Sequence, residues 1–471
     1  MTPQDYPLEP DREEMRAIAD RATSFVIDFI SALPDAPASD LEGFEEAIAR
    51  IKSAAPEEGT SFSELVDQVA VGAAKAFNPA SPGYFAFIPG GGLFAAAIAD
   101  FLSLSVNRFM NLWNPAPVFA AMENDVIRWL CEVFGYPDGA RGILTSGGSI
   151  SNFSALVTAR TAKLPENFLD GCIYVTDQAH ASVVKAAGLA GFPARALRTV
   201  PVTPDLHMDP EALARMVKED RAAGRTPFCV VASVGTTNTG AVDPIAAIAD
   251  LCETEGLWLH ADAAYGGFFA MTERGRALFD GIARADSITL DPHKALFLPY
   301  GTGVLLVRDG ELLREAHRAK GEYLQDLAPE GDIPNFADYS PELSRDFRGL
   351  RVWLPLKLHG LSAFREALDE KLDLTRVLYE ALKSTPGFDV PWQPELTVVP
   401  FRYVPPNGEA DAFNRRLLER INASKRVFLS STRLNGDFWI RACIVSHRTH
   451  RDRIDEAITI ILDAARALDP S

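Results

Sequence analysis

The sequence predicts an α/β fold built on a mostly parallel, doubly wound sheet. Between about residues 81 and 307, continuous apolar runs of strand length alternate with segments of helical length and periodicity. Continuous rather than alternating apolar runs are typical of strands that helices cover on both faces. The predicted strands are 142–145, 172–176, 196–200, 228–234, 257–261, 287–290 and 303–307, and 151–163 and 245–255 are predicted helices. Ligands bind at the carboxyl ends of strands in such sheets, so we expect the functional site there.

The length of 471 residues exceeds what one compact core normally holds, so the chain is expected to divide into domains. Residues 1–80 are predicted to form a helical segment that buries its apolar stripe against a second subunit. Residues 81–355 are assigned to a large domain. Residues 356–471 are assigned to a smaller α+β domain, with strands near 396–403 and 438–445.

Composition and charge exclude several classes of protein. With 47% hydrophobic and 23% charged residues, the chain is not predominantly disordered. A net charge of −18, from 46 basic and 64 acidic residues, argues against a nucleic acid or an anionic membrane as the partner. The five cysteines are scattered, and no metal site is predicted from their spacing. Without a targeting segment or an apolar run of 18 residues, we expect a soluble cytoplasmic protein.

Lys294 points most directly to chemistry. It follows the apolar strand 287–290 and precedes another apolar run. Because removing water from an ammonium group is costly, apolar surroundings favour the neutral amine, which attacks aldehydes. This context indicates the Schiff-base lysine of an enzyme that uses pyridoxal 5'-phosphate (PLP). The alternative is an exposed lysine at a strand-to-loop junction, so the interpretation depends on the other motifs.

A phosphate-binding turn is predicted where the first of these strands meets its helix. Gly147 and Gly148 would let the backbone approach an anion, and Ser149 adds a hydroxyl group. The helix that follows would present free N–H groups and a partial positive charge. An ordinary loop with a serine cap is the alternative interpretation.

Asp262 and Ala264 follow the predicted strand 257–261. A buried carboxylate needs a partner, and the protonated nitrogen of a pyridine ring is one. Ala264 is small enough for a ring to lie against the strand end. Asp262 could instead cap the next turn.

Three further strand ends carry polar side chains. His180 follows strand 172–176 and could stack on the opposite face of a ring, although a lone histidine there is more often a cap. Thr237 lies in a hydroxyl-rich segment after strand 228–234, and Asp291 and His293 precede Lys294. Together these strand ends predict a PLP site more strongly than any one of them does alone.

The chain resembles the PLP-dependent group II amino-acid decarboxylases and is similar to aromatic-L-amino-acid, histidine and tyrosine decarboxylases. The segments that carry the resemblance are 145–152, 177–182, 260–266, 291–294 and 338–348. It extends from about residue 82 to the C-terminus. It implies fold type I, the aspartate-aminotransferase-like fold, and an obligate homodimer with the active site at the interface.

The resemblance also implies a role for each residue. Lys294 becomes the Schiff-base lysine, Asp262 the partner of the pyridine nitrogen, and His180 the ring-stacking residue. Gly148, Ser149, Asp291 and His293 fall around the phosphate, and Thr237 lies near the ring. Tyr323 matches the tyrosine of a mobile catalytic loop, which gives a proton to the substrate after CO₂ leaves. Asp291 stands where the animal enzymes commonly have asparagine, so the substrate is less well defined than the reaction.

The predicted reaction is decarboxylation of an L-amino acid to the amine and CO₂. A PLP-dependent aldehyde synthase or an aminotransferase is the alternative, and a non-catalytic scaffold is a third hypothesis. In aldehyde synthases of this family the loop tyrosine is typically phenylalanine or the stacking histidine is asparagine, so Tyr323 and His180 favour simple decarboxylation. An apolar pocket for an aromatic ring is suggested by Phe87, Ile88, Pro89, Phe109 and Trp113, which could equally pack in the core or at the dimer interface.

Overall fold

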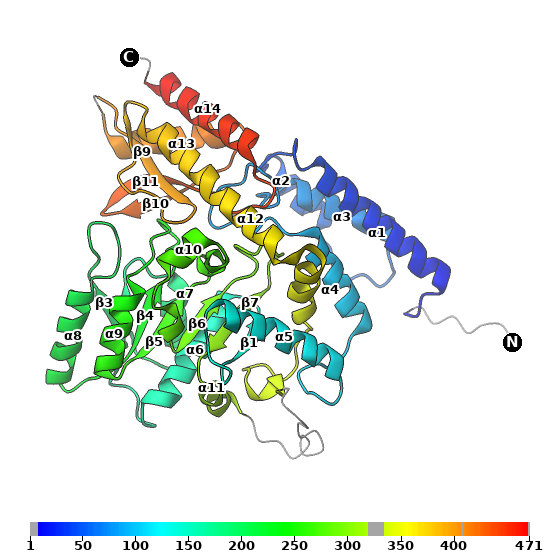
Figure 1. Ribbon diagram of the computed structural model, residues 1–471. Coiled ribbons are helices and arrows are strands. Elements are labelled where there is room, and N and C mark those ends of the chain that lie inside the picture. Colours follow the sequence, from blue (N-terminus) through cyan, green and yellow to red (C-terminus); the bar gives the residue numbers. More distant parts are fainter. Residues whose placement is uncertain (1–7, 319–333, 407, 470–471) are drawn as a thin grey trace.

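The computed structural model describes residues 8–318, 334–406 and 408–469. Three helices come first and lie along one side of the molecule (Figure 1). They are α1 (Arg12–Ala32), α2 (Phe44–Ile51) and α3 (Phe62–Ala74). Asp11 and Glu14 form a capping box at the start of α1, since each side chain accepts a hydrogen bond from the other residue's backbone N–H. No residue of α1 is buried within this chain.

A seven-stranded sheet forms the centre of the molecule, with strand order β1-β7-β6-β5-β4-β2-β3. Its strands are β1 (Arg141–Thr145), β2 (Gly171–Thr176), β3 (Leu197–Val200), β4 (Thr226–Ser233), β5 (Trp258–Asp262), β6 (Ser287–Leu290) and β7 (Gly303–Val307). Neighbouring strands are parallel from β3 through β6, and β7 runs antiparallel to both β6 and β1. The predicted mostly parallel sheet is therefore confirmed.

Helices cover both faces of this sheet. Along β2, Ile173 packs in one apolar cluster, whereas its neighbours Cys172 and Tyr174 pack in another on the opposite face. Residues of α6 and α7 belong to the first cluster, and residues of α5, α8 and α9 belong to the second. The helices of this part are α4 (Phe94–Val106), α5 (Pro117–Val133), α6 (Gly148–Lys163), α7 (Ala181–Leu189), α8 (Pro210–Ala222), α9 (Ile245–Glu255), α10 (Glu273–Leu278) and α11 (Gly310–His317).

A second, smaller sheet lies towards the C-terminus, beside α13 and α14 (Figure 1). Its order is β10-β11-β9-β8, all antiparallel. The strands are β8 (Phe388–Asp389), β9 (Val398–Tyr403), β10 (Ser430–Leu434) and β11 (Asp437–Cys443), and the helices are α13 (Ala410–Asn422) and α14 (Arg451–Leu468). This part has an apolar core of its own.

The long helix α12 (Gly349–Lys383) joins the two parts. Val352 and Leu356 near its start pack in the core of the large sheet, and Leu378 and Leu382 near its end pack in the core of the small one. The helix is kinked at Gly360, where φ is +76°. Because glycine tolerates a positive φ, the chain can change direction at this residue, which separates two helical segments.

Some sequence-based boundaries were wrong. The strand predicted at 196–200 begins at Leu197, because residues Ala194–Ala196 form a 3-10 turn. The strand predicted at 228–234 starts two residues earlier and ends at Ser233. Strand β10 was not predicted, because its exposed face carries polar residues and its apolar content is low. Among the described residues, no helix is long and apolar enough to cross a membrane.

Candidate functional site

The carboxyl ends of three adjacent strands define one cavity. Ser233 at the end of β4 pairs with Asp262 at the end of β5, and Asp262 pairs with Thr289 of β6. This register brings the loops after the three strands to the same edge of the sheet. The residues that line the cavity are His180, Ser233, Gly235, Thr236, Thr237, Asp262, Ala264, Tyr265 and Lys294. Five residues singled out from the sequence therefore share one pocket: His180, Thr237, Asp262, Ala264 and Lys294.

Lys294 is paired with a buried carboxylate. Its Nζ lies 3.0 Å from Oδ2 of Asp291, whose residue is only 2% exposed. The same oxygen lies 3.6 Å from Nε2 of His293. The other carboxylate oxygen, Oδ1, is buried and has no hydrogen-bond partner among the described residues. A cation and an unsatisfied acceptor therefore stand together beside the cavity, where a ligand with a hydrogen-bond donor would satisfy Oδ1.

The two glycines at the start of α6 lie so close to neighbouring residues that neither position has space for a side chain. A Cβ atom on Gly148 would lie 3.0 Å from Oδ2 of Asp291 and 3.3 Å from Cβ of Ala264. Gly147 has a φ of +149°, and a Cβ there would lie 3.2 Å from His293. Ser149, in the first turn of the same helix, is exposed. The backbone N–H groups of this helix end are thus accessible to an anion.

His293 is held in one tautomer by the backbone. Its Nδ1 lies 2.6 Å from the carbonyl oxygen of Thr302, which can only accept, and 3.3 Å from the backbone nitrogen of the same residue. Burial lowers the pKa of His293, although the nearby carboxylate of Asp291 opposes this effect. The shorter of these two contacts requires a proton on Nδ1, so that Nε2 of the neutral ring carries none.

Asp262 is fixed by hydrogen bonds on both of its oxygens. Its Oδ2 accepts from Nδ2 of Asn152 over 3.0 Å, and its Oδ1 accepts from the backbone N–H of Ala264 over 3.3 Å. His180 caps α7, and its Nδ1 lies 2.7 Å from Oγ of Ser182. Burial and the charge of Lys294 lower the pKa of His180. A neutral imidazole beside an oriented carboxylate is therefore the resting arrangement.

Three residues of this site were missed in the sequence. Asn152 and Ser182 stand behind Asp262 and His180; they lie in segments that carry the resemblance, but the sequence assigned them no role. Arg441 is 2% exposed and donates to the carbonyl oxygen of Thr237 over 2.6 Å and to Oγ of Ser430 over 3.0 Å. An arginine inside the apolar strand β11 was the one available signal, because charged side chains are rarely buried unless they have a partner.

Not every predicted residue can be placed in the cavity. Tyr323 lies outside the described residues. The expected apolar pocket of Phe87, Ile88, Pro89, Phe109 and Trp113 does not line the cavity around Lys294 within one chain. Ile88 packs in the core of the large sheet, whereas Phe87 and Phe109 are 57% and 42% exposed. The prediction that these residues line a pocket therefore receives no support from the single chain.

The cavity residues suit PLP. The phosphate of PLP would meet the start of α6, its aldehyde the amine of Lys294, and its ring nitrogen the carboxylate of Asp262. Gly148 lies close to Ala264 and Asp291, so no bulky side chain stands at this place. A phosphate, an aldehyde and a basic ring nitrogen on one molecule thus match the donors and acceptors that this chain presents.

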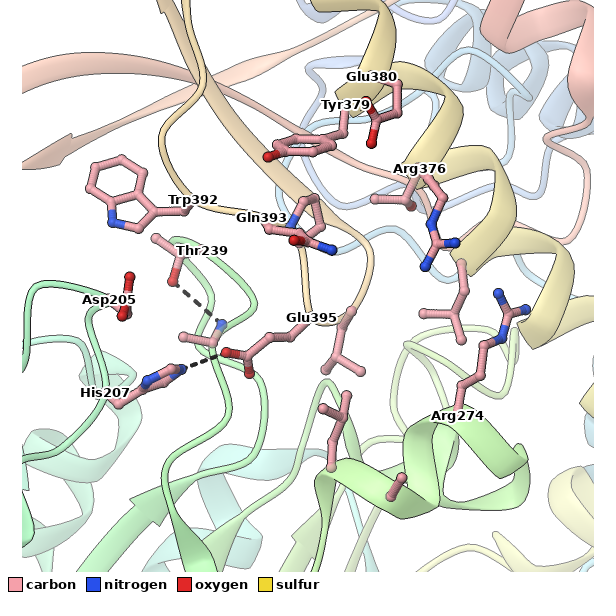
Figure 2. Close-up of a pocket in the computed structure, with 17 residues that line it drawn as sticks. Asp205, His207, Thr239, Arg274, Arg376, Tyr379, Glu380, Trp392, Gln393 and Glu395 are labelled. Carbon is pink, nitrogen blue, oxygen red and sulfur yellow. Dashed lines mark hydrogen bonds and ion pairs between the residues drawn. The ribbon is translucent and has the colours of Figure 1, made fainter. Parts of the chain in front are cut away.

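A second cavity, of about 650 Å³, lies between α10, α12 and residues 392–396 (Figure 2). It contains none of the residues predicted from the sequence. Leu396 lines it and separates it from the first cavity, since a Cβ on Gly235 or Gly266 would lie within 2.9 or 2.7 Å of its Cδ1. Glu395 pairs with His207 at 2.5 Å and raises the pKa of that histidine. We therefore place the chemistry at the first cavity, where the reactive groups are.

Comparison with known proteins gives consistent matches. A profile of the pyridoxal-dependent decarboxylase conserved domain matches residues 45–404. The aromatic-L-amino-acid decarboxylase of Bacillus atrophaeus is 36% identical over 452 residues, which cover 94% of this chain and 93% of that protein. The phenylacetaldehyde synthase of Arabidopsis thaliana is 27% identical, and 98% of each chain is covered. The crystal structure of Oryza sativa TDC with PLP and tryptamine has a TM-score of 0.92 at 26% identity, and covers 98% of this chain and 99% of that one.

Proposed function

Because this chain belongs to the pyridoxal-dependent decarboxylase family, we propose that it removes the α-carboxylate of an aromatic L-amino acid, with Lys294 as the lysine that holds the cofactor. The chain is a PLP-dependent amino-acid decarboxylase of fold type I. The observation that carries the assignment of residues is the meeting of Lys294 and Asp262 in one cavity, with Gly148 of α6 lying against Ala264 of the cavity lining. These groups come from separate parts of the chain, so no local structural requirement explains their proximity.

Each cavity residue has a distinct proposed task. Bound PLP supplies an aldehyde that takes up the amino group and a ring that accepts the electron pair left when CO₂ departs. The carboxylate of Asp262 would hold a proton on the ring nitrogen, and Lys294 would bind the aldehyde carbon until substrate replaces it. His180 would cover one face of the ring, and Thr237 would lie beside it. The helix end at Gly147, Gly148 and Ser149 would hold the phosphate, and Asp291 and His293 would lie around it.

An aromatic substrate is proposed from the relatives rather than from the pocket. The Bacillus relative, at 36% identity, is named for aromatic amino acids, and tryptamine accompanies PLP in the Oryza sativa structure. An aldehyde-forming reaction is the second candidate, since a phenylacetaldehyde synthase is also a relative. His180 and Tyr323 favour the amine as the product, because the resemblance links loss of either residue to aldehyde formation.

We also propose that the enzyme works as a homodimer. Apolar side chains of the N-terminal helices and α4 are exposed in the single chain, and a second subunit would cover them. The most exposed are Ile27 (55%), Val69 (59%), Phe101 (58%) and Leu104 (61%). The proposed division into residues 1–80, 81–355 and 356–471 assigns this surface mainly to the first segment. All five cysteines are buried free thiols, which supports our proposal of a reducing, cytoplasmic location.

Replacement of the lysine tests the function. The purified wild-type protein is loaded with PLP and assayed for CO₂ release from each common amino acid and from dopa. Lys294→Ala is expected to lose the absorption band of the covalently held cofactor and to lower turnover by several orders of magnitude. Lys185→Ala, which changes an exposed lysine of α7, is the matched control. A Lys294→Ala protein that kept the absorption band would overturn the assignment.

A further inference from the structure

A continuous chain of buried hydrogen bonds runs behind the cavity. Nε1 of Trp258 lies 2.9 Å from Oγ of Ser287, which lies 2.8 Å from Nδ1 of His260. Nε2 of His260 lies 3.0 Å from Oδ1 of Asn152. Nδ2 of Asn152 then contacts both Oδ2 of Asp262 and Oγ of Ser182, each at 3.0 Å. Asn152 therefore stands where this chain divides into two branches.

The groups at the two ends of this hydrogen-bond network can only accept or only donate, and they set the direction of every hydrogen bond between them. An ionised carboxylate only accepts hydrogen bonds, so Asn152 must turn its NH₂ group towards Asp262 and its oxygen towards His260. His260 must then carry its proton on Nε2, which leaves Nδ1 as an acceptor for the hydroxyl of Ser287. An indole only donates, which suits the bond from Trp258 to Ser287. Every donor thus finds an acceptor in one consistent arrangement.

The second branch reaches His180. Nδ1 of His180 accepts from the backbone N–H of Ser182 over 3.2 Å and lies 2.7 Å from the hydroxyl of the same residue. Because Nδ1 is an acceptor, neutral His180 carries its proton on Nε2. Asn152 donates to the oxygen of Ser182, which frees the hydroxyl hydrogen for His180.

We propose that Asn152 is a positioning residue beside the cofactor site. It holds Asp262 in a fixed orientation, and through Ser182 it holds His180 in a fixed orientation and tautomer. This inference rests on the proposed function, and it adds a residue to which neither the sequence patterns nor the comparisons give a role. Asn152 is 1% exposed and does not line the cavity, so it acts through its two neighbours. The amide of Asn152 thus links Asp262, which would hold the ring proton, to His180, which would cover the ring.

The charges around this network explain why an amide is needed. Burial lowers the pKa of both His260 and His180, and the charge of Asp262 opposes this effect at both residues. At His180, Lys294 lowers the pKa further and Asp291 opposes the lowering. A carboxylate at position 152 would stand 3.0 Å from Asp262, and two such groups do not both ionise. An apolar side chain would deprive His260 and Asp262 of one hydrogen bond each in a buried place, at Nε2 and Oδ2 respectively.

Four variants test the proposal. Asn152→Leu removes both branches with little change in volume, and Asn152→Asp adds a competing carboxylate. Ser182→Ala weakens only the branch to His180. Thr158→Val is the matched control, because Thr158 is buried in the same helix and its hydroxyl bonds only to the carbonyl oxygen of Ser154. Each protein is measured for PLP affinity, for the pH dependence of the bound cofactor's absorption, and for kcat and KM.

Asn152→Leu is expected to weaken PLP binding and to lower kcat by about ten- to a hundredfold, as is typical when a group that orients a site residue is removed. Asn152→Asp is expected to move the pH midpoint of the cofactor's absorption by about one unit or more. Ser182→Ala should lower kcat but leave that midpoint in place. An Asn152→Leu protein with the wild-type affinity and pH profile, changed only in thermal stability, would overturn the proposal.

A measurement without cofactor separates this inference from the proposed function. Protein with ¹⁵N-labelled histidine is studied by NMR with no PLP added. His260 is expected to be neutral with its proton on Nε2, and Asn152→Asp should change that signal. If His260 carries its proton on Nδ1, the network is wrong even where the enzyme decarboxylates amino acids. If the tautomer is as expected but the wild type binds no PLP, the proposed function fails and the positioning role fails with it.

Discussion

Buried His260 makes the stability of this protein depend on pH. The residue is 1% exposed, and burial lowers its pKa from the ordinary 6.5 to about 4, although Asp262 opposes this effect. Between these two values the unfolded chain binds a proton that the folded chain does not. The contribution of the neutral, buried imidazole to the free energy of unfolding is therefore complete above pH 6.5 and is lost as the pH falls towards 4. With these two pKa values, the free energy of unfolding at pH 5 is lower than at pH 8 by about 2 kcal/mol.

His260→Gln isolates this contribution, because glutamine cannot titrate yet can donate to Asn152 as Nε2 does. Guanidinium unfolding of wild type and variant is followed by tryptophan fluorescence at pH 8, 7, 6 and 5, at fixed protein concentration. The variant is expected to be less stable at pH 8, and the difference should shrink by about 2 kcal/mol at pH 5. His359→Gln, which removes an exposed histidine, is the control. If the wild-type and His260→Gln stabilities change in parallel with pH, the reasoning about His260 is wrong.

Three other predictions follow from the site and the exposed surface. Asp262→Asn should retain some PLP but lose most activity, because an amide cannot keep the ring nitrogen protonated; near-normal turnover would show that another group does so. Removal of residues 1–75 should give aggregates or cofactor-free monomer, and a soluble active monomer in sedimentation would contradict the proposed dimer. Tyr323→Phe should shift the product from amine towards aldehyde with oxygen consumed, since the proposed proton donor to the substrate carbon is lost; an unchanged amine yield would leave Tyr323 without this role.

Local sequence patterns were sufficient for the large sheet. The runs at 287–290 and 303–307 are strands with the predicted bounds, because uninterrupted apolar residues next to polar turns leave few alternatives to a buried strand. The glycines before α6 were also informative, since the space at Gly148 admits no side chain. Strand β10 escaped prediction because alternation with polar residues on an exposed face is a weaker signal.

The sequence by itself determined the fold class, the family resemblance and the residue types that the chemistry needs, because apolar periodicity, glycine turns and a lysine after a strand are local properties. Only the tertiary structure decided which side chains meet. Asn152 reaches Asp262 across 110 positions of sequence, and Arg441 reaches Thr237 across 204. These contacts depend on the strand order, on the register that pairs Ser233 with Asp262, and on the contact of β10 and β11 with the loop after β4. Hydrogen bonds between distant residues form only where folding brings a donor and an acceptor within about 3 Å, and no local pattern encodes that distance.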